Sequence, residues 1–228
     1  MFKVLSIGGS IIVSKDGLNI TFLKKFKKLI LDEVARGTTF ILVAGGGSTA
    51  RTYQDALRKM NIRNDRVLDQ MGIDSTRLNA SFLKYIFADM VHKDIIINFK
   101  KKISTKKSII IAGGEKPGQS SDMAAIVLAK TYGATEFINC SNIDFVYDKD
   151  PHTYSDAQKI EHIDWQSFRR DIVGNVWEPG KHVPFDPIAS RSAQKMNLTV
   201  KMLDGNNIIA LKHALRGEKF QGTVIASY

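Results

Sequence analysis

Phe40-Ile-Leu-Val-Ala-Gly-Gly-Gly-Ser48 is a short apolar run that stops at a cluster of glycines, and the chain contains this pattern three times. The other two copies are Phe2-Lys-Val-Leu-Ser-Ile-Gly-Gly-Ser10 and Ser108-Ile-Ile-Ile-Ala-Gly-Gly-Glu-Lys-Pro-Gly-Gln-Ser-Ser121. Runs this rich in Val, Ile and Phe, apolar on both faces, are typical of buried parallel strands. The three runs therefore predict three strands of one parallel sheet.

The glycines at the ends of these runs predict a ligand. Glycine at the carboxyl end of a strand lets the backbone approach a ligand closely and turn its amides toward an anion. Three such turns indicate that several phosphates are held along one edge of the sheet. Neither the phosphate loop of P-loop enzymes nor a Gly-x-Gly-x-x-Gly followed by an acidic residue about 20 positions later is present, which disfavours both of those enzyme classes.

The bulk composition is typical of one globular α/β domain. The chain has 228 residues, of which 43% are hydrophobic and 25% are charged. It contains no apolar run near the roughly 20 residues that span a bilayer, and it begins with a strand rather than a signal-peptide pattern. We therefore expect a cytoplasmic protein without a membrane partner. Its single cysteine, Cys140, lies in a strand-like run and is interpreted as a buried, inert thiol.

The formal net charge of +10 comes largely from lysines clustered at 24–28 and 100–107. Apolar residues recur with a helical period around the first cluster, so its lysines are expected on a solvent-facing side. The second cluster lies in a loop between two strand-like runs. No aromatic residues alternate with either cluster in the manner of a base-stacking surface. We therefore interpret the charge as solvated faces that attract anionic ligands, and expect no nucleic-acid partner.

Strand-like and helix-like segments alternate along the chain. Strands are expected near 2–7, 39–44, 95–98, 108–112, 135–140, 198–203 and 223–226, and helices near 21–36, from 48, and near 74–91, 121–131, 187–196 and 206–216. One face of helix 74–91 is expected to carry Leu78, Phe82, Ile86 and Met90. The alternation predicts a three-layer α/β/α sandwich with a mainly parallel open sheet. Residues 1–228 are expected to form a single domain, in which the N-terminal half binds the acceptor substrate and the C-terminal half binds the nucleotide.

The second glycine turn, residues 45–51, opens a helix. Exposed amides and the helix dipole favour an anion at such a position. Arg51, about one turn into the helix, is placed to reach back with a bidentate guanidinium. The alternative is a tight strand-to-helix turn with Arg51 in water.

The third glycine turn, residues 113–122, is the richest in functional groups. Pro117 stiffens it, and Ser120 and Ser121 offer hydroxyl groups at a helix N-terminus. Asp122 either caps that helix or acts functionally, in which case it orients a cation or a donor group, because a carboxylate repels phosphate.

Three aspartates follow the strand near 135–140. Asp144, Asp148 and Asp150 lack the spacing of a calcium loop, and no dedicated metal site is predicted. A solvated turn, with Asp150 preceding a proline, is the alternative for each of them.

Together these segments resemble the amino acid kinase superfamily and, within it, the archaeal uridylate kinases. The resemblance spans the whole chain, and the order of the motifs is more specific than any one of them. The motifs are the three glycine turns, Ser141-Asn-Ile-Asp-Phe-Val-Tyr-Asp-Lys-Asp-Pro151, Phe185-Asp-Pro-Ile-Ala189 and Gly217-Glu-Lys-Phe-Gln-Gly-Thr-Val-Ile225, with Leu68-Asp-Gln-Met-Gly-Ile-Asp-Ser-Thr-Arg-Leu-Asn-Ala80 favouring the uridylate kinases.

The resemblance implies transfer of the γ-phosphoryl group of ATP to UMP with Mg²⁺, in pyrimidine nucleotide biosynthesis, and assembly as a homohexamer. It assigns catalytic roles to Asp122 and Arg51. The residues that it implies for ATP binding are Gly9, Ser10, Gly47, Arg51, Ser141, Asn142, Tyr147 and Asp150. Those that it implies for UMP binding are Gly46, Asp69, Glu115, Lys116, Pro117, Gly118, Gln119, Ser120 and Ser121.

Three positions depart from the family pattern. Ser6 stands where bacterial relatives carry lysine and archaeal ones often carry aspartate, and Phe145 replaces a usual glycine. Glu115 places an anion in the third glycine turn, where the resemblance puts the UMP-binding loop. Lys116 and Lys181 are candidates to supply the positive charge that Ser6 does not provide.

Two other functions stay open from the sequence. One is a kinase of the same superfamily for another small acid or phosphate acceptor. The other is a non-catalytic nucleotide-binding or storage protein on the same fold.

Overall fold

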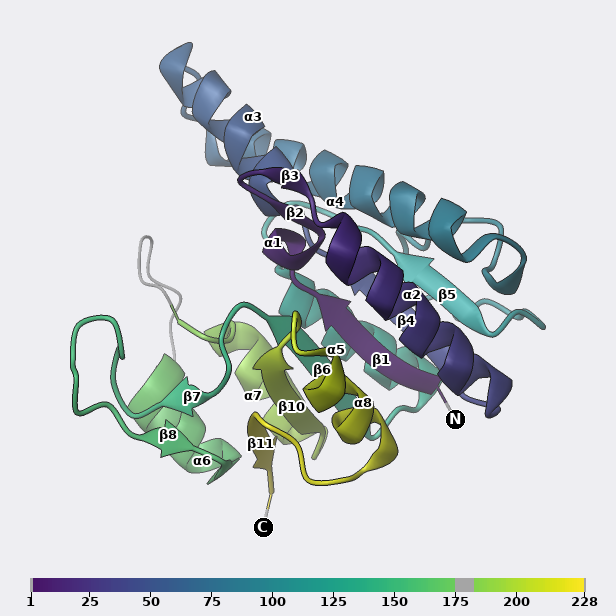
Figure 1. The fold of residues 1–228 in the computed structure, drawn as a ribbon. Coiled ribbons are helices and arrows are strands. Elements are labelled where there is room, and N and C mark those ends of the chain that lie inside the picture. The colour runs from purple at the N-terminus through teal and green to yellow at the C-terminus, as the bar shows by residue number, and fades with distance from the viewer. Residues whose placement is uncertain (1, 175–182, 228) are drawn as a thin grey trace.

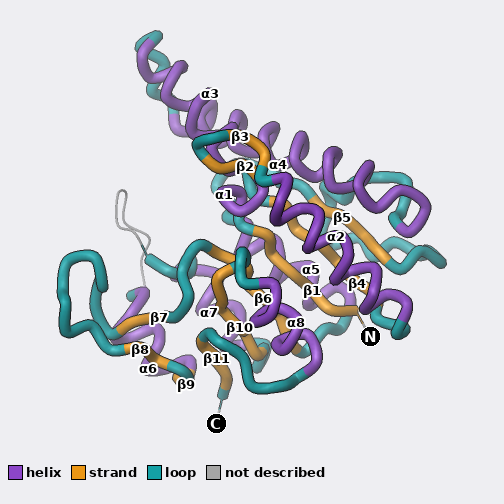
Figure 2. Tube along the Cα trace, viewed as in Figure 1, coloured by secondary structure: helices purple, strands orange, loops and turns teal. Residues whose placement is uncertain are grey.

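The computed structural model describes residues 2–174 and 183–227, and a seven-stranded sheet runs through this part of the chain (Figures 1 and 2). Lys181 lies outside the described residues. The strand order is β5-β4-β1-β6-β10-β11-β9. The strands are β1 (Phe2–Ile7), β4 (Thr39–Ala44), β5 (Ile109–Ala112), β6 (Glu136–Ser141), β9 (His162–Asp164), β10 (Thr199–Asp204) and β11 (Thr223–Ala226). The five strands from β5 to β10 are parallel; β11 pairs antiparallel with β10, and β9 pairs parallel with β11, so both of these strands run opposite to the other five. The mainly parallel sheet is thus confirmed.

Helices cover both faces of the sheet, which confirms the three-layer sandwich (Figure 1). One layer contains α1 (Gly9–Ile12), α2 (Ile20–Ala35), α4 (Asp65–Phe87) and α8 (Ile208–Arg216). The other contains α5 (Ser121–Tyr132), α6 (Trp165–Ser167), η2 (Phe168–Val173) and α7 (Pro187–Lys195). The remaining helix α3 (Gly47–Lys59) packs on α4, and η1 (Ala88–Met90) follows α4. Two small hairpins pair β2 (Val13–Ser14) with β3 (Gly17–Leu18) and β7 (Val146–Tyr147) with β8 (Lys159–Ile160).

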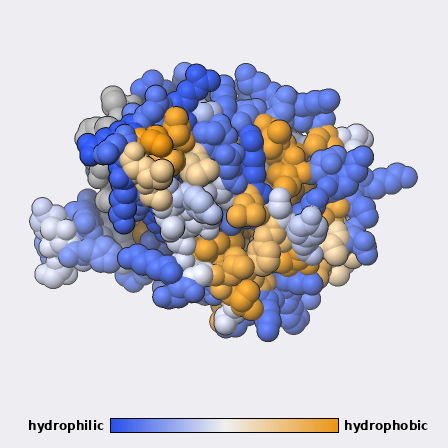
Figure 3. All heavy atoms as spheres, turned by 90° about the horizontal axis from the view of Figure 1, so that it is seen from above, coloured by the Kyte–Doolittle hydropathy of each residue, from blue (hydrophilic) through white to orange (hydrophobic). Residues whose placement is uncertain are grey.

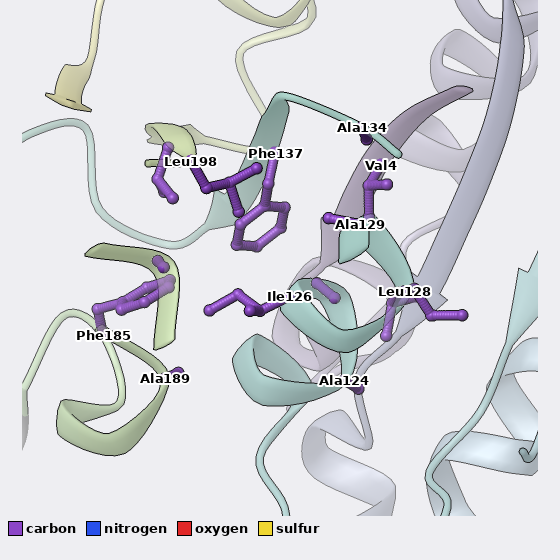
Figure 4. Packing of buried hydrophobic residues seen from close by; sticks show 14 of the residues in the cluster. Val4, Ala124, Ile126, Leu128, Ala129, Ala134, Phe137, Phe185, Ala189 and Leu198 are labelled. Atoms are coloured by element: carbon purple, nitrogen blue, oxygen red, sulfur yellow. The ribbon is translucent and has the colours of Figure 1, made fainter. Parts of the chain in front are cut away.

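The central strands bury side chains on both faces, as their uninterrupted apolar runs predict. In β1, Val4 belongs to the cluster under α5 and α7, whereas Leu5 belongs to the cluster under α2, α4 and α8. Figure 4 shows the first of these clusters, in which the rings of Phe137 and Phe185 lie 6.2 Å apart. A strand buried on both sides needs no alternation of polar residues, and this explains the sequence pattern.

Helix α2 confirms the interpretation of the first lysine cluster. Phe22, Leu23, Phe26, Leu29 and Ile30 are buried on one side of the helix. The four lysines between residues 24 and 28 are exposed on the other side. The positive charge of this cluster therefore lies in solvent, as the helical period predicts.

Helix α4 is longer than the sequence predicts and buries a different face. It begins at Asp65, where the Asn64 side chain accepts a hydrogen bond from the Val67 amide, and it ends at Phe87 rather than 91. The sequence pattern did not predict the first two turns of α4, because they contain Gly72 and glycine disfavours helix interiors. A methyl group there would lie 3.2 Å from Gln54 Nε2 of α3, so glycine permits close packing of the two helices. The predicted apolar face is half right: Phe82 and Ile86 are partly buried against the core, whereas Leu78 and Met90 are 60% and 46% exposed. The fully buried residues of the helix are Leu68, Ile73, Ser75, Asn79, Ala80, Leu83 and Phe87.

The strand predicted at 95–98 is also wrong. This segment runs along the open edge of β5 and pairs with it only through isolated bridges at Val91 and Ile96. The Ile96 amide donates to Ile111 and its carbonyl accepts from Gly113, but Ile97 is 49% exposed. The segment therefore makes too few ladder bonds to form a strand. The other predicted ends differ from the observed ones by one or two residues.

Candidate nucleotide and phosphate site

The first two glycine turns lie against each other at the carboxyl ends of the adjacent strands β1 and β4. A methyl group on Gly9 would collide with the backbone nitrogen of Gly47, and one on Gly45 would collide with that of Gly9. Gly47 also has a φ of 67°, a conformation that favours glycine. The two turns can approach this closely only without side chains. Gly45 and Gly47 are buried, whereas Gly9 and Gly46 are partly exposed, so the two turns together present one continuous stretch of backbone that suits a shared ligand.

The N-terminus of α3 belongs to this surface. The helix starts at Gly47, and its N-cap Gly46 provides no side-chain hydrogen bond to the first amides. Arg51 is exposed in the first turns of α3, and no other described residue holds its guanidinium by a hydrogen bond or ion pair. Ser48 instead anchors the turn, because its hydroxyl donates to the Ser14 carbonyl at 2.5 Å. Free amides and a free guanidinium at one helix end favour an anion.

The first two residues of the third glycine turn have a structural reason to be glycine. A methyl group on Gly113 would lie 3.0 Å from the side chain of Arg77, and one on Gly114 would lie 3.0 Å from Ile73 and Thr76. These glycines therefore let the turn lie directly on α4. The prediction that they approach a phosphate is not needed to explain them.

The rest of this turn, residues 115–121, we call the acceptor loop. Asp69 of α4 accepts a hydrogen bond from the Gly118 amide at 3.0 Å, so the structure brings together two residues predicted for one ligand. Gly118 has a φ of 78° and follows Pro117, the arrangement of a type II turn. Lys116 is exposed, whereas Pro117, Gln119, Ser120 and Ser121 are partly buried. The Gln119 Oε1 atom is buried and has no hydrogen-bond partner among the described residues.

Glu115 does not direct its charge into the acceptor loop. Its Oε1 atom accepts a hydrogen bond from the Phe99 amide at 3.2 Å, in the segment beside β5. The carboxylate is thus held by a neutral donor from that segment.

Asp122 is the carboxylate of the site, and it does not cap α5. The cap is Ser120, whose hydroxyl oxygen accepts from the Met123 amide at 3.1 Å. The two oxygens of Asp122 accept from Asn139 Nδ2 at 3.2 Å and from the Asp186 amide at 3.1 Å. Burial raises the pKa of Asp122 from 3.8 to about 7, although both hydrogen bonds act in the opposite direction. Two neutral donors and no bonded cation leave this carboxylate ready to bind a positive group.

The predicted ATP residues beyond β6 lie in a loop stabilised by its own hydrogen bonds. Ser141 ends β6 and is partly buried, and Asn142 is exposed. The Tyr147 hydroxyl donates to Asp144 at 3.1 Å. Asp150 accepts from the His152 amide and the Thr153 hydroxyl, as expected for the turn alternative. Within the described residues, no three acidic, histidine or cysteine side chains gather into a metal site.

The two other departures from the family pattern have ordinary surroundings. Ser6 is buried in β1, in register with Asn139 of β6. Phe145 does not have a positive φ, so its position does not require glycine. Its ring is 8% exposed and is covered by the Lys159 ammonium at 4.9 Å. Cys140 is buried, as predicted, and burial raises the pKa of its thiol to about 12, which disfavours the reactive thiolate.

Three residues of this edge were not singled out from the sequence. Asn79 Nδ2 of α4 donates to the Gly45 carbonyl at 2.7 Å and supports the second turn. Asn139 and the Asp186 backbone hold Asp122. A polar residue at an otherwise buried position was the available signal for both asparagines, because buried amides require partners. The contact of Asp186 has no local signal, since it depends on tertiary packing.

The sequence and structure were compared with known proteins. Residues 1–204 match the model of the amino acid kinase family. A uridylate kinase from Methanococcoides burtonii is 30% identical, over 97% of this chain and 96% of the relative. The crystal structure of uridylate kinase from Archaeoglobus fulgidus has a TM-score of 0.83 and 29% identity, over 99% of this chain and all of that one. The structure of UMP kinase from Bacillus anthracis, at 18% identity, shares the fold with a TM-score of 0.80, over 99% of this chain and 95% of that one.

Proposed function

The chain belongs to the amino acid kinase family, and we propose that it is an ATP:UMP phosphotransferase that forms UDP and ADP. The similarity to uridylate kinases extends over nearly the full length of both chains. The observation that carries the proposal is the arrangement of the three glycine turns. Two of them meet at the ends of β1 and β4, and the acceptor loop is joined to Asp69 beside them. One sheet edge thus offers a surface for two phosphate-bearing ligands.

The two substrates would divide this edge between the halves of a single domain. ATP would bind Gly9, Ser10 and Gly47 with its phosphates and Ser141, Asn142, Tyr147 and Asp150 with its nucleoside. UMP would bind Gly46, Asp69 and the acceptor loop. The buried, unpartnered Oε1 of Gln119 supports this assignment, because a donor of the bound nucleotide would satisfy it.

Catalysis would depend on position and charge. Phosphoryl transfer demands alignment of the two substrates and neutralisation of the transferred group rather than covalent chemistry by the protein. Arg51 would contact the phosphates between the substrates, which is supported by its exposed guanidinium at the start of α3, without a hydrogen-bond partner among the described residues. Asp122 would hold a positive group at the transfer point.

Magnesium would enter with ATP. Mg²⁺ is usually bound by one or two carboxylates together with substrate phosphates and water. Asp122 fits that description, because its oxygens accept only from neutral N–H groups of the described residues. The ion, when bound, would neutralise charge on the phosphates.

A coupled assay for ADP release tests the proposed activity. It would compare UMP, CMP and a panel of small carboxylic acids as acceptors, each with and without EDTA. We expect turnover with UMP that disappears when magnesium is chelated. Turnover with another acceptor but not with UMP would contradict the proposal, as would ATP binding without turnover.

We further propose that the enzyme is cytoplasmic, serves pyrimidine nucleotide synthesis and assembles as a homohexamer. No helix among the described residues is long and apolar enough to cross a membrane. Figure 3 shows hydrophobic side chains in separate patches among hydrophilic ones on the face seen from above. Exposed apolar residues of α3 and α4 include Tyr53, Val67, Leu78 and Tyr85, and burying them between copies supports assembly.

A further inference from the structure

Thr223 is a buried polar residue that the proposed site does not use. It lies in the C-terminal motif, residues 217–225, and is the first residue of β11. Its residue surface is 0% exposed. Its hydroxyl accepts a hydrogen bond from the Val146 amide at 2.8 Å and donates one to the Ile160 carbonyl at 2.5 Å. This hydroxyl thus acts as donor and acceptor at once.

Both partners of Thr223 belong to the hairpin of β7 and β8. Val146 and Ile160 lie opposite each other in its register. The hydroxyl therefore ties both strands of the hairpin to β11, which is part of the seven-stranded sheet. Each strand of the hairpin has only two residues, and a small isolated hairpin is marginally stable in water. The place of this hairpin consequently depends on its attachments to the sheet.

Gly222 explains how Thr223 comes so near. A methyl group on Gly222 would collide with the Met202 carbonyl oxygen of β10 and with the Phe220 ring. The backbone before Thr223 can therefore lie directly against β10 only without a side chain. The adjacent glycine and threonine of the motif thus serve one purpose, which is to bring a buried hydroxyl to the hairpin.

The hairpin carries residues that we propose for the nucleoside of ATP. We call residues 141–150 the nucleoside loop. The loop begins at the end of β6, and Thr223 holds it at Val146. Tyr147 directly follows the anchored amide, and its hydroxyl donates to Asp144 of the same loop at 3.1 Å. A shift of Val146 would therefore displace Tyr147.

From these contacts we propose that Thr223 is a positioning residue for the nucleoside of ATP. Its hydroxyl fixes the hairpin against β11 and so sets the place of Tyr147 in the nucleoside loop. Thr223 does not itself contact the nucleotide, because it is fully buried. The inference rests on the proposed function, because it takes ATP to be the ligand of the nucleoside loop.

Thr223→Val is the decisive variant. Valine has nearly the shape of threonine but lacks the hydroxyl, so the Val146 amide and the Ile160 carbonyl lose their shared partner. Thr223→Ser keeps the hydroxyl and should behave as wild type. Thr131→Val is the matched control, because the Thr131 hydroxyl also donates to a backbone carbonyl, that of Phe99 at 2.7 Å, in the segment beside β5.

The test is calorimetric titration with ATP and steady-state kinetics with ATP and UMP, together with thermal melting of each protein. Loss of one buried hydrogen-bonding group should raise the Kd and the KM for ATP about threefold to tenfold in Thr223→Val. The kcat and the KM for UMP should change by less than about twofold, because the loop holds ATP equally in the ground state and the transition state. Thr223→Ser and Thr131→Val should keep the wild-type values for both nucleotides.

An unchanged Kd for ATP in Thr223→Val would overturn the inference, even if the melting temperature falls. An equal rise in the KM for UMP, or an equal rise in the Kd for ATP in Thr223→Ser, would also overturn it. If Thr223→Val does not fold, Thr223→Cys decides by the same comparison, since a thiol is a weak donor and acceptor.

The calorimetric arm separates this inference from the proposed function. A wild-type protein that binds ATP without UMP turnover would contradict the proposed function, and the ATP affinities of the variants would still decide the role of Thr223. A wild-type protein that does not bind ATP would overturn both.

Discussion

Asp122 occupies an unfavourable place for a carboxylate. Burial raises its pKa from 3.8 to about 7, and no cation of the described residues is hydrogen-bonded to it. A group that lowers stability in this way is characteristic of functional sites, where stability is lost in exchange for activity. The proposed role of Asp122, binding a positive group, requires a carboxylate, and a neutral residue would not supply that charge.

The raised pKa predicts how Asp122→Asn changes stability with pH. The folded state holds the proton more tightly than the unfolded chain, so this group favours folding below pH 3.8 and that contribution is lost as pH rises through about 7. Asparagine removes the titration. The free energy of unfolding of Asp122→Asn relative to wild type should therefore rise by about 2 to 3 kcal/mol between pH 5 and pH 8.

Urea unfolding without nucleotide at both pH values measures this difference. The same variant should lose most of its turnover at pH 8, because it can no longer hold a cation at the transfer point. Equal relative stability at the two pH values would show that Asp122 titrates normally. Retained turnover would exclude it from the transfer site.

Arg51 gives the second prediction for a single side chain. Because its guanidinium is exposed and unbonded among the described residues, Arg51→Ala should leave the melting temperature unchanged. Loss of a charged donor at the transferred group should lower kcat/KM by about a hundredfold or more. Arg58→Ala is the control, since Arg58 lies in the last turn of α3 and, among residues 2–174 and 183–227, pairs with Asp55 alone. A wild-type rate in Arg51→Ala would remove Arg51 from the phosphate site.

At the scale of elements, the glycines of the three turns fall into two groups, according to which part of the fold leaves no room for a side chain. Gly9, Gly45 and Gly47 let two turns meet, whereas Gly113 and Gly114 let a third turn lie on α4. Only Gly47 among these five has a positive φ in the described chain. Close approach of backbone segments, rather than turn conformation, is thus the main reason for these glycines.

This division predicts different costs for two glycine substitutions. A methyl group in Gly9→Ala would collide with the backbone of Gly47, so the variant should lose about 3 kcal/mol or more of unfolding free energy. Gly37→Ala has a φ of 91° but open space around the methyl group, and it should lose only about 1 to 2 kcal/mol.

Calorimetric titration with ATP distinguishes the two variants further. Gly9→Ala should lose ATP binding with its displaced turn, and Gly37→Ala should retain it. Similar unfolding free energies for the two variants would contradict the packing of the turns. ATP binding by Gly9→Ala at wild-type affinity would contradict the assignment of the first turn to ATP.

The sequence predicts strong elements better than their boundaries and partners. The apolar runs of β1, β4 and β5 identify the parallel centre of the sheet because these strands are buried on both faces. The predicted helix began too late because of Gly72, a residue that disfavours helix interiors. In the structure a glycine is accommodated there because α3 packs closely against α4. Segment 95–98 has strand composition but lies at an open edge with few ladder bonds. Both errors arise from tertiary contacts that local patterns do not contain.

At the scale of the whole molecule, the sheet order explains why distant motifs meet. Strands β5, β4, β1 and β6 are neighbours and parallel, so the segments after all four end on one edge. The glycine turns and Asp122 were predictable as candidates because their residue types suit phosphate and cation binding. Asn79 and Asn139 were not, since they act through groups that only the fold brings near.

The proposed assembly gives one prediction at this scale. Sedimentation of the purified protein should yield a single species of six chains, because exposed apolar residues of α3 and α4 gain by burial between copies. Leu78→Glu, on an exposed position of α4, should reduce the sedimentation coefficient without changing the helical content. A monomeric wild-type protein would contradict the proposed hexamer while leaving the site within one chain intact.

The central claim is that one sheet edge holds ATP and UMP for direct transfer between them. The most direct measurement is to incubate the enzyme with ATP labelled at the γ-phosphate and with UMP, and to separate the products. Direct transfer should place the label in the β-phosphate of UDP, formed in equal amount with ADP. Label released as inorganic phosphate, or transferred only when another acceptor replaces UMP, would contradict it.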